Sequence, residues 1–359
     1  MYFNGTLSID PSQLTKIQRV PPKGAFRRLL NFITIGGLSE KKELETFTAI
    51  SILQQFHSVF RSMGINNVVR IAQDDLDFYL DEEGKEDDLK EALDKYEIEM
   101  DATVAQFFNH LYLVLEHREG SFNYLIDISI NRSHEVGEYP ISITVNGLLS
   151  EFECNNGSAN EVLKSKMKSI FSSQKSYDTF ASEKSKEFQL FMNKLEQNIK
   201  KFIKIDDIIN KYDTKIVAPT QPVNSPKEIY HSRTAEPVYH GYSGMDASFL
   251  YSFMWYDMCH NHNIYINNVD VVNENGSDML YVGEEGYNLG EYDTTSFQTM
   301  AEDVVEPAEV EVPVDSLSSD SDSSWFSGWG DSDSSSDSNS GSSCSSCSSC
   351  SSCSSCGGD

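Results

Sequence analysis

The chain has 359 residues, of which 39% are hydrophobic and 11% aromatic, and this allows two or three domains with a hydrophobic core. Its formal net charge of −28 is unevenly distributed: residues 234–359 contain 22 Asp and Glu and no Lys or Arg, whereas residues 1–233 contain 34 acidic and 28 basic residues. This polyanionic character argues against nucleic acid as a partner, because phosphate binding needs clustered Lys and Arg.

The sequence shows no signal for export or membrane insertion. Residues 1–11 lack the basic and apolar regions of a secretory signal peptide. No apolar run approaches the roughly 18 residues that a transmembrane helix requires. We therefore expect a cytoplasmic protein, in which the seven cysteines are reduced, bound to metal or modified.

Residues 1–38 form a predicted lead-in segment before the first domain. Its basic residues precede an apolar patch made of Phe26, Leu29, Leu30, Phe32, Ile33 and Ile35. Such a patch favours a short helix that packs on the core. The alternative is that the 16–35 segment lies on an anionic membrane surface as an interfacial helix.

Residues 39–215 are predicted to form an α+β core domain. Ser39 is a suitable N-cap for a helix that ends at Gly64, and apolar residues recur between them every three or four positions. Residues 66–71 are expected to form a short strand after this helix.

The next stretch, residues 74–101, is strongly acidic. Its second part is predicted to enter an amphipathic helix, whose apolar stripe extends from Leu89 to Leu115 and ends near Gly120. The carboxylates mostly lie off this stripe and show no calcium-loop spacing, so they indicate a solvated face.

Residues 121–152 are predicted to form a three-strand antiparallel meander at the centre of the domain. Apolar and polar residues alternate from Phe122 to Ile130 and again from Ile141 to Val145. Asn146-Gly147 follows between two apolar runs, and this dipeptide is the strongest local signal of a type I′ hairpin turn. Residues 148–152 are therefore expected to return as the third strand.

Long amphipathic helices are expected on both sides of the meander. After it, residues 158–161 have the capping-box pattern of a helix start. A longer helix is predicted from about Tyr177 to Tyr212, because apolar residues recur there at three- and four-residue steps. Its length also suits a helical arm, so self-association through residues 177–212 is an alternative to packing on the sheet.

The remaining sequence changes in composition. Residues 216–238 are rich in proline and are expected to form a linker. Residues 239–299 are rich in aromatic residues and are predicted to hold a helix at 249–256 and short strands; they either form a small domain or dock on the first one. Residues 300–359 are acidic and rich in Ser and Cys, so we expect this tail to be disordered.

The most regular motif is a row of cysteines in the tail. Each cysteine is separated from the next by two serines, and the set is Cys344, Cys347, Cys350, Cys353 and Cys356. Two thiolates at this spacing reach one ion, so the five cysteines can supply a four-sulfur site for zinc or a site of lower coordination for copper(I). The alternatives are S-acylation, which would bring the protein to a membrane, intermolecular disulfides, or no specific role.

A second group of metal-ligating residue types consists of Cys259, His260 and His262. Adjacent residues on a helix point in different directions, so at most two of these side chains are expected to reach one ion. Neither H-E-x-x-H nor a paired C-x-x-C is present beside them. The group is therefore either a metal site or a histidine cluster at the end of a helix.

No motif in the sequence identifies a catalytic site. The nucleophile elbow, the phosphate-binding loop and the dinucleotide fingerprint do not occur, and no residue is assigned a catalytic or cofactor-binding role. We expect a binding or assembly scaffold whose acidic, thiol-rich C-terminal tether binds soft metal, with a protein partner that the sequence does not identify. The alternatives are a metal-dependent enzyme that uses Cys259, His260 or His262, and a peripheral membrane protein acylated on its tail cysteines.

Overall fold

The computed structural model describes residues 1–9, 20–34, 39–74, 76–81, 83–94, 109–132, 140–153, 160–205, 207–218, 251–273 and 276–290. All of these residues belong to the first of the chain's two units, Met1–Pro307.

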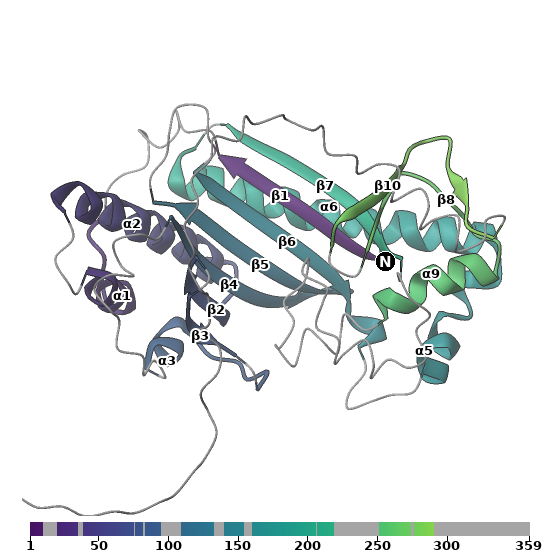
Figure 1. The fold of residues 1–359 in the computed structure, drawn as a ribbon, viewed down its shortest axis with the longest axis horizontal. Helices are drawn as coiled ribbons and strands as arrows, with labels where there is room; N and C mark the ends of the chain where they lie inside the picture. Colours follow the sequence, from purple (N-terminus) through teal and green to yellow (C-terminus); the bar gives the residue numbers. More distant parts are fainter. Residues whose placement is uncertain are drawn as a thin grey trace, which may run out of the picture. The chain divides into compact units, whose positions relative to one another are not determined.

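The centre of this unit is a nine-stranded sheet, which Figure 1 shows nearly face on. Its strand order is β10-β9-β7-β1-β6-β5-β4-β2-β3. Neighbouring strands are antiparallel, except that β7 and β9 are parallel. The strands are β1 (Tyr2–Ile9), β2 (Asn67–Gln73), β3 (Leu76–Leu80), β4 (His110–Glu119), β5 (Phe122–Asn131), β6 (Ile141–Leu149), β7 (Ile208–Val217), β9 (Val269–Val272) and β10 (Asp278–Val282). A separate two-stranded sheet pairs β8 (Tyr265–Ile266) with β11 (Tyr287–Asn288).

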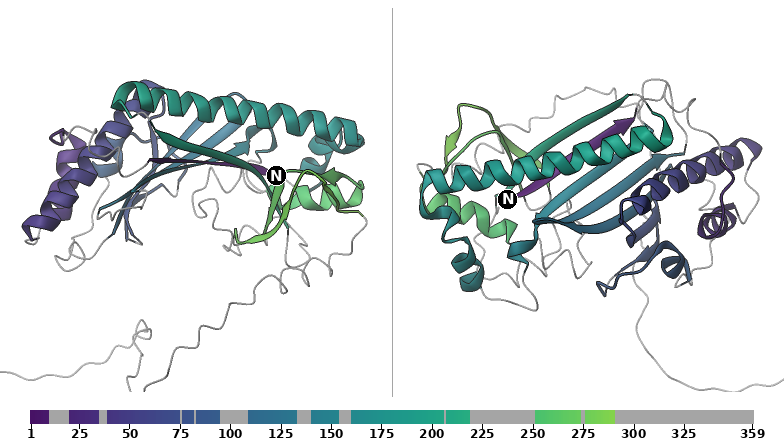
Figure 2. Two further views of the ribbon diagram at one scale, coloured as in Figure 1. Left: turned by 90° about the horizontal axis from the view of Figure 1, so that it is seen from above. Right: turned by 180° about the vertical axis from the view of Figure 1, so that it is seen from behind.

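Two helices, α2 and α6, lie along one face of the large sheet (Figure 2). The described helices are α1 (Ala25–Thr34), α2 (Glu40–Ser62), α3 (Leu89–Asp94), α5 (Asn160–Met167), α6 (Gln174–Ile203) and α9 (Ser252–Asn261), with short 3-10 helices at Ser150–Phe152 and Ile170–Ser172. Helices together with a large mixed sheet agree with the predicted α+β class. Among the described helices, none has both the length and the apolar character needed to span a bilayer.

The predicted three-strand meander is wrong, because the sheet has nine strands and residues 146–147 do not form a turn. Strand β6 continues through Asn146 and Gly147, which pair with Asn4 and Phe3 of β1. A Cβ atom on Gly147 would lie 2.8 Å from the ring of Phe188 in α6. Gly147 therefore allows the helix to approach the sheet closely. Because Asn146 precedes this glycine, the pair has the same sequence as a hairpin turn although it lies within a strand.

Strand β1 was not predicted, because residues 1–9 were assigned to the lead-in segment. The strand lies inside the sheet between β6 and β7 (Figure 1). Phe3, Leu7 and Ile9 are buried on the helix-covered face. Gly5 also faces α6, where a Cβ would lie 2.5 Å from the flexible end of the Met192 side chain.

The helix predicted across residues 89–115 is wrong from His110 onward. Helix α3 ends at Asp94, residues 95–108 lie outside the described part, and β4 begins at His110. Leucines four residues apart, at 111 and 115, fit a helix and a strand equally well. The buried Leu113 between them gives the two-residue alternation that belongs to the strand.

The predicted helix from Tyr177 to Tyr212 is correct only for its first part. Helix α6 ends at Ile203, and Lys204 follows in the left-handed region with φ of 59°. The chain then returns as β7, which pairs antiparallel with β1. Ile209 and Tyr212, which extended the helical pattern, therefore lie on opposite faces of a strand.

Several predicted elements are confirmed. Ser39 caps α2 by accepting a hydrogen bond from the Lys42 backbone N–H, and β2 occupies the place of the predicted strand at 66–71. The helix in the aromatic segment is α9, and β9 and β10 form an antiparallel pair. Since β9 pairs with β7, the described residues of this segment join the main sheet.

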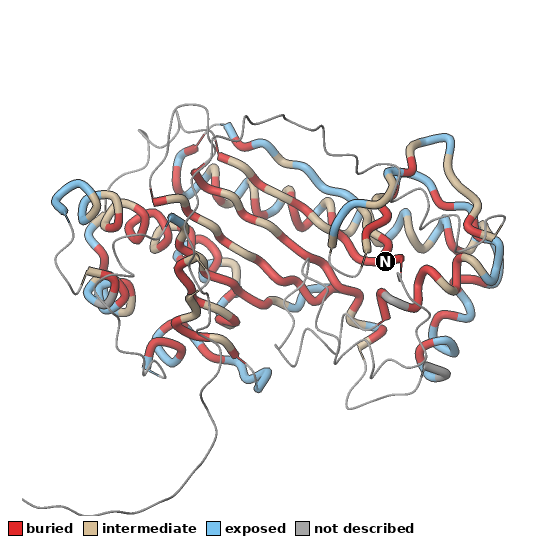
Figure 3. The backbone as a smooth tube through the Cα atoms, viewed as in Figure 1, coloured by how far each residue is buried: buried red, intermediate tan, exposed pale blue. Residues whose placement is uncertain are grey.

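The two faces of the sheet differ in chemistry, and Figure 3 shows the resulting alternation of buried and half-buried residues along β1, β6 and β5. The helix-covered face holds aromatic residues such as Tyr124, whose ring stacks on Phe191 of α6 with a centroid distance of 3.7 Å. The opposite face carries small polar residues on its three central strands: Asn4, Thr6, Ser8, Asp127, Ser129, Ser142, Thr144 and Asn146. The core therefore lies between the sheet and α2 and α6.

Candidate functional site

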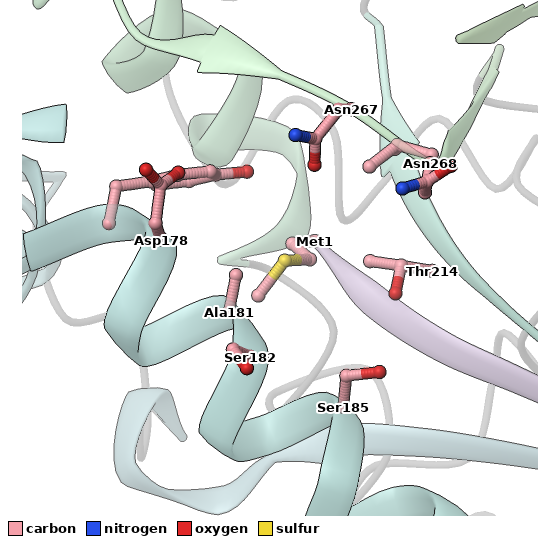
Figure 4. A pocket seen from close by; sticks show the side chains of 10 residues that line it. Met1, Asp178, Ala181, Ser182, Ser185, Thr214, Asn267 and Asn268 are labelled. Carbon is pink, nitrogen blue, oxygen red and sulfur yellow. The ribbon is translucent and has the colours of Figure 1, made fainter. Parts of the chain in front are cut away.

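A pocket with a volume of about 470 Å³ opens beside the first half of α6, and we call it the α6 pocket. Figure 4 shows side chains from four separate parts of the chain around it. Its lining residues are Met1, Tyr177, Asp178, Ala181, Ser182, Ser185, Thr214, Asn267, Asn268 and Val269. This volume lies within the range of roughly 300–1,000 Å³ that is typical of small-molecule sites.

Helix α6 forms one wall of the pocket. The helix begins after Ser173, whose side chain accepts a hydrogen bond from the Ser176 backbone N–H. Its lining residues occupy positions 177, 178, 181, 182 and 185, which fall on one side of a helix with 3.6 residues per turn. The wall therefore presents a carboxylate and two hydroxyl groups along about two turns of helix, beside the buried side chain of Tyr177.

The opposite rim is the connection between β8 and β9, which carries Asn267 and Asn268. The side-chain amide of Gln174 fixes one end of this connection, because it donates to the Tyr265 carbonyl and accepts from the Tyr265 N–H, both at 2.8 Å. Asn268 has φ of 50° in the left-handed region, and its N–H donates to the Gly283 carbonyl. These bonds hold the rim in place before any ligand arrives.

The floor of the pocket is mostly apolar. Met1 is fully buried, Val269 is 6% exposed, and Ala181 packs against the core. Among the described lining side chains, Asp178 is the one carboxylate, and none is Lys, Arg or His.

Tyr177 connects the pocket to a buried aromatic cluster. Its ring lies 5.7 Å from that of Phe171 and 6.2 Å from that of Trp255. Its hydroxyl hydrogen-bonds to the thiol of Cys259, which is fully buried. Burial raises the pKa of Cys259 to about 12, so the sulfur is a neutral thiol at pH 7 and a poor metal ligand.

The structure does not bring Cys259, His260 and His262 together. His260 Nδ1 donates to the Leu289 carbonyl at 2.5 Å, and His262 is exposed with its ring 6.1 Å from that of Phe171. Across the residues that the structure describes, no group of three His, Cys, Asp or Glu side chains is placed to hold a metal ion. His260 instead ties α9 to the end of β11.

The tail cysteines, Cys344, Cys347, Cys350, Cys353 and Cys356, lie outside the described residues. Their proposed metal binding therefore stays a prediction from sequence.

The polar residues of the α6 pocket were not predicted from the sequence as a site. These residues belong to common polar types and lie up to 86 positions apart in the chain: Ser182, Ser185, Thr214, Asn267 and Asn268. No local motif joins them, because the fold creates their proximity. Only Asn267-Asn268, a polar pair between two short strands, is a local signal of an exposed functional loop.

Comparison with models of known protein families, with curated proteins and with solved structures finds no match to this chain in any of the three.

Proposed function

We propose that the chain is a binding protein that holds a small polar molecule in the α6 pocket, and that its acidic, thiol-rich tail acts as a tether. The observation that carries this proposal is the construction of the pocket. Side chains from Met1, α6, β7 and the β8–β9 connection converge on one cavity, and the Gln174 amide fixes its rim. A preformed site of this kind reduces the entropy lost on binding.

The lining favours binding over catalysis. A serine nucleophile needs an adjacent base, and no described lining residue is a histidine or a lysine. Asp178 lies at the exposed mouth, where its carboxylate accepts a hydrogen bond from Gln174 Nε2 at 2.7 Å. Cys259, the nearby thiol, is protonated and buried behind Tyr177. The polar groups of the pocket are therefore suited to orienting a ligand.

Two further roles stay predictions from sequence. The tail cysteines are proposed to take up zinc or copper(I), with S-acylation as the alternative. Self-association through residues 177–212 would have to use the outer face of α6, because Phe188, Leu195 and Ile199 are buried inside the chain. Leu190 and Phe202 are the large apolar residues that this outer face exposes, at 69% and 53%.

The proposed pocket function can be tested by methyl NMR on the full chain. Ala181 and Val269 each place a methyl group at the pocket, and the Ala181→Gly and Val269→Ile variants assign their signals. The panel contains a monosaccharide, a polyol, an amino acid, a nucleoside, a polyamine and a phosphate ester. We expect at least one class to shift both signals while the methyls of Ala49 and Val59, in α2, stay unchanged.

A matched pair of variants tests whether the ligand binds in the α6 pocket. Ser182→Phe places an aromatic ring in the lining, whereas Glu183→Phe adds the same ring at the next position, which is exposed and outside the lining. The ligand should be lost with Ser182→Phe and kept with Glu183→Phe. If no class shifts the two methyls, or if both variants bind equally, the α6 pocket is not the ligand site.

A further inference from the structure

We infer that the ligand of the α6 pocket is an uncharged polyhydroxylated molecule of about the size of a monosaccharide. This inference rests on the proposed function and names its ligand class. Three properties of the lining lead to it: its charge, its set of hydrogen-bonding groups and its apolar floor.

The charge of the pocket disfavours anionic ligands. A phosphate or a carboxylate needs a cationic partner or several directed N–H groups when it leaves water. No described lining side chain is cationic. The charged lining residue is Asp178, whose carboxylate would repel an anion.

A cationic ligand is also disfavoured. Asp178 is exposed, so its attraction for an ammonium group is screened by water. One of its oxygens already accepts the hydrogen bond from Gln174 Nε2. A single screened carboxylate compensates poorly for the dehydration of an ammonium ion inside the pocket.

The uncharged polar groups match the hydroxyl groups of a sugar or polyol. The hydroxyls of Ser182, Ser185 and Thr214 each donate and accept hydrogen bonds. The amides of Asn267 and Asn268 on the opposite rim add two donors and an acceptor each. Each ligand hydroxyl is likewise both donor and acceptor, so these groups can satisfy it from two sides of the cavity (Figure 4).

The floor supplies the remaining feature, a surface for the C–H groups of the ligand. Met1, Ala181 and Val269 contribute apolar atoms to the lining, and Figure 4 shows Met1 between α6 and the β8–β9 connection. A pyranose or an inositol has hydroxyls around its edge and C–H groups on its faces. Such a ring fits a cavity with polar walls and an apolar floor, and its burial on the floor adds hydrophobic stabilisation.

The test is isothermal titration calorimetry of the full chain with three ligands that share one ring and differ in charge: glucose, glucosamine and glucuronate. myo-Inositol and galactose widen the neutral set. We expect a neutral member to bind at least tenfold more tightly than the two charged ones. Asn267→Ala, which removes one amide from the rim, should weaken this binding about tenfold, the effect of losing one hydrogen bond.

Two variants serve as controls. Asn198→Ala removes an amide from α6 at a position outside the lining and should leave the affinity unchanged. Glu183→Gln removes a negative charge from α6 at an exposed position outside the lining and should also leave the affinity unchanged. Circular dichroism confirms that each variant is folded.

The outcomes separate this inference from the proposed function. Tightest binding of glucosamine or glucuronate, or methyl shifts at Ala181 and Val269 caused only by non-hydroxylated classes, would overturn the ligand class and leave a functional pocket. Absence of any shift with every class would refute the pocket function itself.

Discussion

Gly147→Ala tests whether the close contact between α6 and the sheet explains the glycine in β6. The added Cβ would lie 2.8 Å from two ring carbons of Phe188 and 3.2 Å from the ring of Phe122. Both rings are 1% exposed or less, so they have little room to move. Overpacking of this kind costs about 1–3 kcal/mol, and replacing glycine in a strand returns about 0.5–1 kcal/mol. We expect a net loss of stability of about 1–2 kcal/mol.

The decisive comparison repeats this change in the Phe188→Leu background. Leucine removes the ring atoms that the new Cβ would touch, so Gly147→Ala should then cost less than about 0.5 kcal/mol or be stabilising. Urea unfolding of the four proteins, followed by circular dichroism, gives the coupling energy. A hairpin turn at residues 146–147 would require positive φ at Gly147 and would penalise alanine equally in both backgrounds. Equal costs would therefore refute the close-packing explanation.

Three further predictions address other parts of the chain. Burial, with a smaller effect from Arg61, lowers the pKa of His57 from 6.5 to about 4. Between these pH values the folded state binds fewer protons than the unfolded state, so the free energy of unfolding should have its full value above pH 6.5 and fall by about 3 kcal/mol toward pH 4. His57→Gln should abolish this contribution of His57 to the pH dependence of stability. Gln73 is 1% exposed, and both its amide atoms lack a hydrogen-bond partner among the residues that the structure describes. Gln73→Leu should therefore raise the free energy of unfolding by about 1–3 kcal/mol, and a decrease would contradict this. The reduced full chain should show thiolate-to-metal absorption with zinc or copper(I) that weakens as pH falls, and a chain truncated before residue 340 should not; equal spectra would exclude the tail cysteines.

Local sequence patterns correctly predicted those elements whose pattern fits one kind of secondary structure. Helix α2 combines an N-cap at Ser39 with a regular apolar stripe, and it appears within a residue or two of the expected bounds. The alternation from Phe122 to Ile130 predicts a strand, and β5 confirms it, although Asn123 and Leu125 show that its first half is buried on both faces.

The errors came from residues that serve two purposes. Asn146-Gly147 reads as a turn, but the glycine is needed to admit Phe188, a residue more than 40 positions away. Leu111 and Leu115 fit both a helix and a strand because four is close to the helical period and is a multiple of the strand period. A long-range contact decided each case, and such contacts have no local signature.

The α6 pocket was beyond prediction for the same reason. Met1, Ser182, Thr214 and Asn268 meet because β1 and β7 are neighbours and α6 crosses them. None of these residues has unusual chemistry by itself. By contrast, Cys259 was a candidate metal ligand because of its residue type, and the fold places it in the core as a neutral thiol.

The most direct test of ligand binding in the α6 pocket is the intermolecular nuclear Overhauser effect between a bound neutral sugar and the methyl groups of the protein. With the sugar held against the apolar floor, its ring C–H protons should give effects to the methyls of Met1, Ala181 and Val269. The methyls of Ala49 and Val59 in α2 should show none. Effects confined to α2 or other methyls outside the lining, with none at Ala181 and Val269, would contradict a ligand site in this pocket.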